Sequence, residues 1–440
     1  MARLLIMMAA LGIMGVPTAR ASGDELTQAV GRDYPYLEAL YLDLHRNPEL
    51  SFLEFRTAKR LAEELRGLGY SVSEGVGKTG VVAVLKNGEG PTVMIRADMD
   101  ALPVAEETGL DYASKVTATG IDGTTSPVMH ACGHDVHMTV WTGTARRLAA
   151  MKDAWRGTLV MVAQPAEERG GGARQMLADG LFQRFPRPDY NLALHVSAAL
   201  PAGHIAYTKG YALANVDSVD ILVRGVGGHG AYPNMTKDPV VLASQIVLAL
   251  QTLVSREISP LEPAVVTVGS IHGGTKHNII GDEVRLQLTV RSYTDEVRAQ
   301  LLAGIARIAQ GQAMAAGLPE DKWPQVAIAD EHTPATYNDP ALVARLLPTL
   351  AATVGADKLH ETGPVMGGED FSEYGRVAPK IPSFIFWLGA VERQTFAKAE
   401  ESGAALPSLH SPFFAPEPKP TITTGVEAMT SAALALFGGD

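Results

Sequence analysis

Apolar and polar positions alternate along this chain with two different periods, which indicates strands and helices in turn. Apolar residues recur at helical spacing over residues 26–44, 54–67, 136–151 and 171–180. Short apolar runs predict strands at residues 81–85, 92–97, 157–163, 190–195 and 383–388. The turn Asn87-Gly88 predicts that the first two of these strands form a hairpin. Strands alternating with helices predict an α/β fold, a mixed and largely parallel sheet with helices on both faces.

The pattern changes in the middle of the chain. Strand-like runs at residues 216–224, 264–271, 283–292 and 325–329 enclose helical patterns at 238–255 and 295–316. The order β-α-β-β-α-β is that of a ferredoxin-like α+β unit. We therefore expect this unit as an inserted domain over residues 213–332, between the two parts of the larger domain at residues 22–212 and 333–440.

The first 21 residues predict a secretory signal peptide. Arg3 precedes an apolar core at residues 4–16, and Ala19-Arg20-Ala21 fits a cleavage site. The apolar core is too short to span a bilayer comfortably. We expect an exported protein, periplasmic or secreted after cleavage near Ala21, with no stable membrane insertion.

Composition narrows the classes of function. The 440 residues are 46% apolar and 19% charged, which is typical of a globular protein of two domains. The net charge of −11 argues against nucleic acid as a partner. The single cysteine, Cys132, cannot form an internal disulfide. In an exported chain a free thiol is exposed to oxidation, and ligation of a metal is one way to protect it.

Candidate chemistry concentrates in residues 129–137, MHACGHDVH. Gly133 lets the backbone bend between Cys132 and His134 at the start of a predicted helix. A thiolate and an imidazole together suit Zn(II) or a similar borderline metal.

Three predicted strands end in residues with metal-binding or acid–base side chains. Asp98 and Asp100 follow the first, the pair Glu167-Glu168 the second, and His195 the third. Open α/β sheets bind ligands at the carboxyl ends of their strands, so we expect these residues to meet. In such a pair one carboxylate can ligate a metal while its neighbour acts as a general base.

These residues lie in motifs that resemble a known family. The motifs, in chain order, are RADMDALP (96–103), MHACGHDVH (129–137), QPAEE (164–168), ALH (193–195), GGHGAYP (227–233), MGGEDFSEY (366–374) and LHSPFF (409–414). They resemble the amidohydrolase branch of the co-catalytic metallopeptidases, the aminoacylase and carboxypeptidase-G-like superfamily that includes hippurate hydrolases and auxin-conjugate hydrolases.

The resemblance implies two divalent metal ions per subunit, of Zn, Mn, Ni or Co. It implies that Glu167 is the general base and that the inserted domain is a lid through which the protein forms a homodimer. His229 on the lid matches a histidine that reaches a substrate site in its own or the other subunit. The implied metal ligands are Cys132, His134, Glu168, His195 and His410. The implied substrate contacts are Asn278, Arg291, Gly367 and Gly368.

Two positions depart from the superfamily pattern. Asp98-Met99-Asp100 stands where relatives have His-x-Asp, and we expect Asp100 to orient a ligand histidine. Asn278-Ile279-Ile280-Gly281 stands where this branch has Asn-Val-Ile-Pro. This difference affects the expected geometry of the lid hinge, not the expected chemistry.

The resemblance implies a metal-dependent amidohydrolase that cleaves N-acyl amino acids, such as hippurate-like, acetyl or aryl-acyl conjugates. A carboxypeptidase or dipeptidase could use the same site on short peptides. A catalytically silent periplasmic binding protein is the alternative from another class, although the intact set of ligands argues against it.

Overall fold

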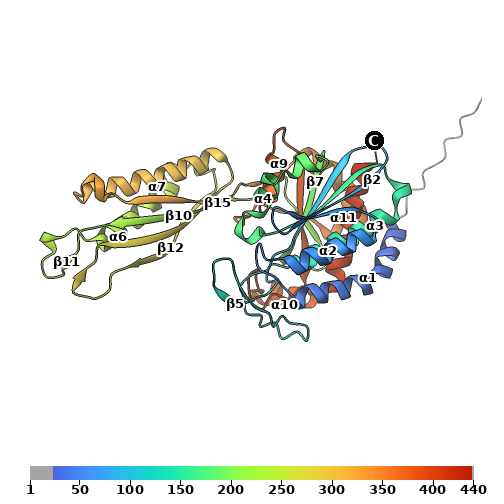
Figure 1. The fold of residues 1–440 in the computed structure, drawn as a ribbon, viewed down its shortest axis with the longest axis horizontal. Helices are drawn as coiled ribbons and strands as arrows, with labels where there is room; N and C mark the ends of the chain where they lie inside the picture. Colours follow the sequence, from blue (N-terminus) through green and yellow to red (C-terminus); the bar gives the residue numbers. More distant parts are fainter. Residues whose placement is uncertain (1–22, 439–440) are drawn as a thin grey trace, which may run out of the picture.

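The computed structural model describes residues 23–438, and the predicted signal peptide lies outside this range. The described chain forms a large body and a smaller lobe that projects from one side of it (Figure 1). The body contains an eight-stranded sheet in the order β1-β2-β6-β3-β7-β18-β8-β17. Its strands are β1 (Ser71–Val76), β2 (Gly80–Asn87), β6 (Gly157–Gln164), β3 (Thr92–Asp98), β7 (Tyr190–Pro201), β18 (Ser383–Val391), β8 (Ile205–Tyr207) and β17 (Leu359–Glu361).

The centre of this sheet is parallel, because β6, β3, β7 and β18 all run in one direction. Most residues of β3 and β6 are buried, as expected of strands covered on both faces. Antiparallel pairs occur toward the edges, between β1 and β2, β2 and β6, and β18 and β8. The predicted mixed, largely parallel sheet is confirmed.

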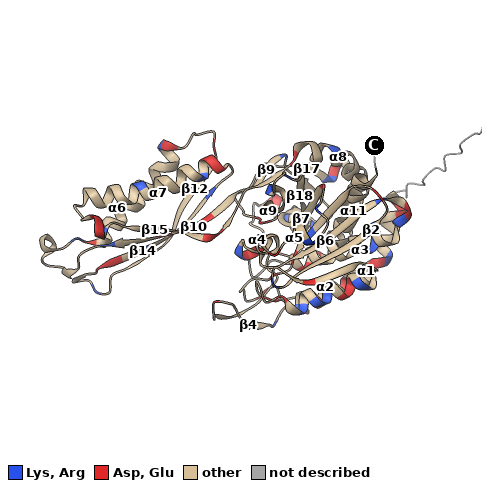
Figure 2. Ribbon diagram, turned by 45° about the horizontal axis from the view of Figure 1, so that its top comes forward, with Lys and Arg blue, Asp and Glu red and all other residues tan. Residues whose placement is uncertain are grey.

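Helices cover both faces of the sheet. On one face α1 (Gly23–Arg46), α2 (Phe55–Gly67), α3 (His134–Ala150), α8 (Pro340–Val354) and α11 (Pro418–Phe437) pack on a large apolar core. The other face is covered by the shorter helices α4 (Gly172–Ala178), α5 (Leu181–Arg184) and α9 (Ser372–Arg376). Charged residues of both signs interleave along α1 and α2 (Figure 2). Most apolar residues of both helices are buried against the core.

The predicted hairpin between β2 and β3 is wrong. β6 lies between these two strands and pairs antiparallel with β2 and parallel with β3. The hairpin that does form joins β1 to β2, through a turn closed by the Val76–Gly80 pair. The Asn87-Gly88 turn therefore ends β2 without pairing it to the next strand.

The lobe is a four-stranded antiparallel sheet in the order β12-β14-β10-β15, with two helices on one face. Its strands are β12 (Ala264–Gly273), β14 (Glu283–Ser292), β10 (Asn215–Arg224) and β15 (Gln325–Thr333), and its helices are α6 (Pro239–Thr252) and α7 (Asp295–Ala315). This is the order and topology of a ferredoxin-like unit. β10 and β15 connect it to the body (Figure 1).

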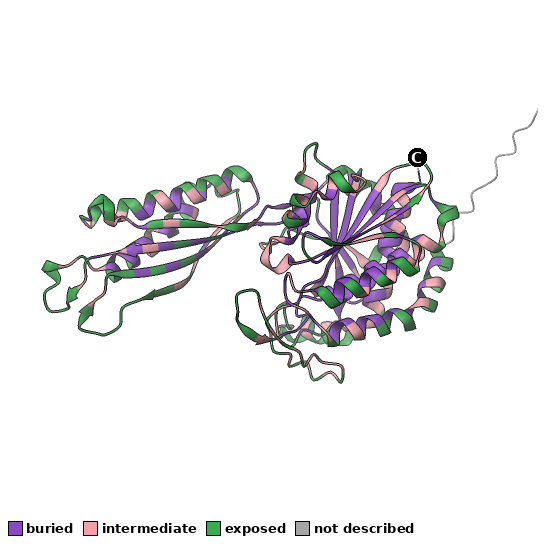
Figure 3. Ribbon diagram, viewed as in Figure 1, coloured by how far each residue is buried: buried purple, intermediate pink, exposed green. Residues whose placement is uncertain are grey.

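The lobe has its own apolar core, and its buried and exposed positions alternate along the strands and helices (Figure 3). Some of the exposed positions are apolar. Leu242, Ile246 and Leu250 of α6 pack inward, whereas Val241 and Leu248 are exposed. Within residues 23–438, the helical run Pro239–Glu257 is long and apolar enough to cross a bilayer, and 33% of its most apolar stretch is buried.

Candidate metal and catalytic site

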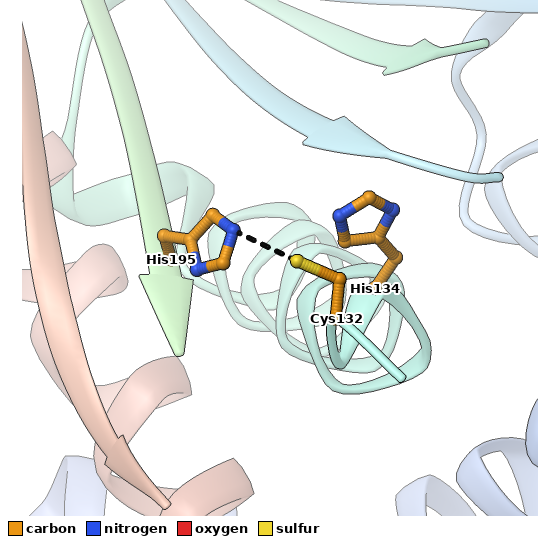
Figure 4. A group of neighbouring side chains, drawn as sticks. All are labelled: Cys132, His134 and His195. Atoms are coloured by element: carbon orange, nitrogen blue, oxygen red, sulfur yellow. Dashed lines mark hydrogen bonds between the residues drawn. The ribbon is translucent and has the colours of Figure 1, made fainter. Parts of the chain in front are cut away.

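The carboxyl ends of β3 and β6 meet the start of α3 at one edge of the body sheet. His195 joins them from the middle of β7, because this strand continues past its predicted end to Pro201. Gly133 adopts a left-handed conformation, with φ of 76°, immediately before α3. A Cβ at this position would lie 2.6 Å from the side chain of Val196, so the close turn requires glycine. The turn directs Cys132 and His134 toward His195 of β7 (Figure 4).

Two groups of donor atoms share the Cys132 thiol. In the first, donors of Cys132, His134 and His195 lie within 4.8 Å of one another, and in the second the same holds for Cys132, Glu168 and His410. The Cys132 sulfur lies 3.5 Å from His195 Nε2 and 3.3 Å from His410 Nε2. The structure thus brings all five predicted ligand residues together, in two adjoining groups that could each hold one metal ion.

The donor set fits metal ions rather than a hydrogen-bonded core. His134 Nε2 and Glu168 Oε1 are buried without a hydrogen-bond partner, and they lie 3.9 Å apart. Buried polar atoms normally have partners, so two such atoms facing each other mark a place for a cation. Sulfur, imidazole and carboxylate donors are those that Zn(II) and similar divalent metals accept.

Backbone carbonyls fix two of the imidazoles. His134 Nδ1 donates to the carbonyl of Asp100 at 2.7 Å, and His195 Nδ1 donates to the carbonyl of Val196 at 2.8 Å. Each bond leaves the lone pair of Nε2 free to bind a metal.

Asp100 also holds the loop that carries the two glutamates. Its carboxylate accepts the backbone N–H groups of Glu167 at 3.0 Å and Glu168 at 3.1 Å, and the Ser51 hydroxyl at 2.6 Å. The predicted role of Asp100 is to orient a ligand histidine. In the structure its backbone carbonyl accepts from His134, whereas its side chain orients the Glu167-Glu168 turn.

Burial, together with the negative charge of neighbouring carboxylates, raises the pKa values of the two glutamates. Burial, followed by Glu369 and the neighbouring Glu168, raises the pKa of Glu167 well above its usual range. Burial raises the pKa of Glu168 to about 7, although His134 opposes the shift. Burial tends to lower the pKa of His134, but Asp98 and its other acidic neighbours raise it to about 10. Nearby cations would relieve this repulsion.

A buried arginine beside the site was missed from the sequence. Arg96 of β3 contacts Asp98 at 2.7 Å, Glu369 at 2.8 Å and Asp370 at 3.0 Å, and all four side chains are fully buried. Asp98 also accepts a 2.6 Å hydrogen bond from His137 Nδ1. An arginine inside an otherwise apolar strand is the signal that could have predicted this network, because buried charges require partners.

A cleft of about 1130 Å³ opens from the metal groups toward the lobe on one side and α10 (Arg393–Ser402) on the other. Of the predicted substrate contacts, Arg291, Gly367 and Gly368 line it. Arg291 is half-buried and donates to the carbonyl of Met366 at 2.6 Å. The apolar wall of the cleft includes Leu200, Trp387, Phe396, Leu406 and Leu409.

Two predicted site residues do not reach this cleft in their own chain. His229 lies in β11 (Gly228–His229), which pairs with β13 (Ile279–Ile280) beside Asn278. This pair of strands lies at the end of the lobe farthest from the body (Figure 1). Both His229 and Asn278 are exposed and neither lines the cleft.

Comparisons with known proteins agree with this geometry. The sequence pattern of Peptidase family M20/M25/M40 matches residues 94–410. Thermostable carboxypeptidase 2 of Saccharolobus solfataricus is 38% identical over 84% of this chain and 88% of its own length. N-acetylcysteine deacetylase of Bacillus subtilis is 38% identical over 79% of this chain and 86% of its own. A solved dinuclear metal-binding peptidase from B. subtilis superposes with a TM-score of 0.73 at 28% identity, covering 92% of this chain and 99% of that one.

Proposed function

The chain belongs to Peptidase family M20/M25/M40 and is a metal-dependent hydrolase with a two-metal site, and from that premise we propose that it cleaves the amide bond of N-acyl amino acids. The observation that carries the proposal is the meeting of five ligand residues with Glu167 beside one cleft, which all of them except the buried His134 line. Cys132, His134 and His195 would hold one ion, and Glu168 and His410 would complete the second group.

Metal ions bound there supply polarisation of the scissile carbonyl and a more acidic water. The carboxylate of Glu167 belongs to a third group of donors with His134 and Glu168, so it would lie beside a metal ion that those two residues helped to hold. As general base, Glu167 accepts the proton of the attacking water and then delivers it to the leaving amine. Asp100 keeps the base in place through the backbone N–H of Glu167.

The two sides of the cleft suggest where each half of the substrate binds. Arg291 offers a guanidinium on the lobe side, which suits the carboxylate of an amino acid. Leu200, Trp387, Phe396 and Leu406 offer an apolar surface on the other side, which suits an aryl or long alkyl acyl group. The deacetylase among the relatives supports an N-acyl substrate, and the carboxypeptidase supports the second candidate, release of a carboxyl-terminal residue from a short peptide.

We further propose that two chains associate through their lobes and that His229 acts in the partner's cleft. β12 is an edge strand of the lobe sheet, and Val241 and Leu248 on α6 are exposed apolar residues beside it. If two copies associated along this surface, His229 of each chain would lie near the cleft of the other chain, although it does not reach the cleft of its own. At that cleft the imidazole would stabilise the oxyanion. Export through the predicted signal peptide remains part of the proposal.

A substrate screen tests the function. The purified protein, loaded in turn with Zn(II), Mn(II), Ni(II) or Co(II), is offered N-acetyl, N-benzoyl and longer N-acyl amino acids, their carboxamides, and short peptides. We expect release of free amino acid from the large apolar conjugates and weak activity on the carboxamides. Preferred cleavage of unblocked peptides would favour the carboxypeptidase, and inertness of every N-acyl amino acid with all four metals would refute the proposal.

Arg291→Gln, with Arg285→Gln on the same strand as its control, tests the binding of the carboxylate. Arg285 is exposed and does not line the cleft. The Arg291 variant should raise KM for N-acyl amino acids by about 10-fold or more, since a charge-assisted pair is lost, whereas the Arg285 variant should not.

A further inference from the structure

A buried glutamate from another part of the chain supports the loop that carries Glu167. Glu54 precedes α2, is fully buried, and accepts the backbone N–H of Ala166 at 2.9 Å. Ala166 is the residue immediately before Glu167. We propose that Glu54 is a positioning residue for the general base and acts through Ala166; the inference rests on the proposed role of Glu167.

Ala166 needs such support because its backbone is strained. It has φ of 49° and ψ of 43°, a left-handed conformation that residues with a Cβ rarely adopt. The two dihedral angles of Ala166 determine the direction in which the chain enters Glu167. If Ala166 relaxed to a right-handed conformation, the carboxylate of Glu167 would turn away from the metal groups.

The surrounding loop leaves little room for another arrangement. The N–H of Gly172 donates to the carbonyl of Ala166 at 3.2 Å. A Cβ on Gly172 would lie 1.6 Å from the carbonyl oxygen of Pro165, so the loop closes tightly on itself. Asp100 holds the next two backbone N–H groups, and Glu54 therefore completes a series of three consecutive amides bound by buried carboxylates.

Glu54 is itself held rigidly, which a positioning residue requires. Its Oε1 also accepts the N–H of Phe52 at 2.9 Å, and its Oε2 accepts the hydroxyl of Thr79 at 2.5 Å. Its backbone carbonyl accepts the N–H of Ala58 in the first turn of α2. Glu54 thus connects the start of α2 and the β1–β2 turn to the catalytic loop without belonging to either group of metal ligands.

The chain offers both a conservative variant and a matched control. In Glu54→Gln, the amide oxygen can still accept from Ala166, and the amide nitrogen can donate to the Thr79 oxygen, so the contact survives. In Glu54→Ala the contact is lost. Glu49 accepts two backbone N–H groups of α2, those of Arg56 and Thr57, but does not contact the loop, so Glu49→Ala removes a comparable support of the helix alone.

In the metal-loaded enzyme, Glu54→Ala should lower kcat by about 10- to 100-fold with KM changed by less than about 3-fold. Glu54→Gln and Glu49→Ala should stay within about 3-fold of the wild-type kcat by the same reasoning. Metal content and folding are measured for every variant. Should Glu54→Ala fail to fold, Thr79→Val, which removes one hydrogen bond to Glu54, should lower kcat by about 5-fold, which is more than the controls allow.

Amide hydrogen exchange gives a readout that does not depend on the substrate. In metal-free protein, exchange at residues 166–168 should accelerate at least about 10-fold in Glu54→Ala and remain unchanged in Glu49→Ala. Unchanged exchange in this loop, or a full kcat in folded and metal-loaded Glu54→Ala, would overturn the positioning role. If the wild type cleaved no N-acyl amino acid, the proposed function would fail while the exchange result still decided whether Glu54 holds the loop.

Discussion

Replacing Arg96 with methionine should remove a large part of the stability of the body. Arg96 is fully buried and lies within 3.0 Å of an oxygen of each of three fully buried carboxylates, those of Asp98, Glu369 and Asp370. Methionine fills most of the volume but leaves these groups without their cation. Removing one partner of a buried ion pair costs about 3–5 kcal/mol, and here one cation serves three partners, so we expect at least that range near pH 8.

The loss should depend on pH, with a sign that follows from Asp370. Burial raises the pKa of Asp370 to about 7 even though Arg96 opposes the shift, and without Arg96 the pKa must rise further. A carboxyl group whose folded-state pKa is raised binds a proton in the folded state as the pH falls through that value. The destabilisation of Arg96→Met should therefore be largest at pH 8 and should shrink toward pH 5.5.

Urea unfolding of metal-free protein, followed by the fluorescence of the buried Trp141 and Trp155 in the body, measures the effect. With a slope of about 3 kcal/mol/M, a loss of 3–5 kcal/mol lowers the midpoint by about 1–2 M. Arg66→Met is the control, because Arg66 pairs with Glu74 on the surface, where such a pair contributes about 0–1 kcal/mol at most. Equal losses in the two variants, or a loss for Arg96→Met that grew on acidification, would refute this reasoning.

Three further predictions concern the site. Removing the metals with a chelator should abolish turnover. In the same way, Cys132→Ser should lower the metal content measured by atomic emission, because a hydroxyl binds Zn(II) far more weakly than a thiolate. Full metal content in this variant would contradict the ligand role of Cys132. Mixing the His229→Ala and Glu167→Gln variants and letting their subunits exchange should restore about a quarter of wild-type activity if the site is shared. The reason is that half of the dimers are then mixed, and one of the two sites in each mixed dimer is intact. Verified mixed dimers without activity would exclude action of His229 in the partner's cleft. Leu406→Ala should lower kcat/KM for N-benzoyl substrates by about 10-fold while sparing N-acetyl substrates; an equal loss on both would remove Leu406 from the acyl wall.

The fold was predictable where local pattern determines structure. Strands buried on both faces, such as 92–97 and 157–163, read as continuous apolar runs, and the strict alternation of residues 283–292 identified a strand of the lobe. The hairpin was wrong because a turn signal at Asn87-Gly88 says nothing about a strand that enters the sheet 70 residues later. Pairing between distant segments depends on the whole sheet, which no local window contains.

The site was predictable to the extent that its residues lie in short motifs at strand ends. Cys132, Glu167 and His195 each follow from a local feature, and in the structure each lies in a group of donor atoms with His134. Arg96 and Glu54 were missed because the partners that define their roles are far away in the sequence. Besides Asp98, Arg96 binds two residues more than 270 positions later, and Glu54 binds a backbone amide 112 positions later. Every residue except proline has a backbone N–H, so the sequence does not indicate which of them a buried carboxylate binds. A contact of this kind can only be found in the structure.

The most direct test of a two-metal hydrolase with Glu167 as its base is the pair of metal content and kcat in Glu167→Gln. The amide is nearly isosteric with the carboxylate but cannot accept the proton of the water. We predict two metal ions per chain, as in the wild type, and a kcat on N-acyl amino acids reduced by about 10²- to 10⁴-fold. A fully metal-loaded Glu167→Gln enzyme with near wild-type kcat would contradict the account.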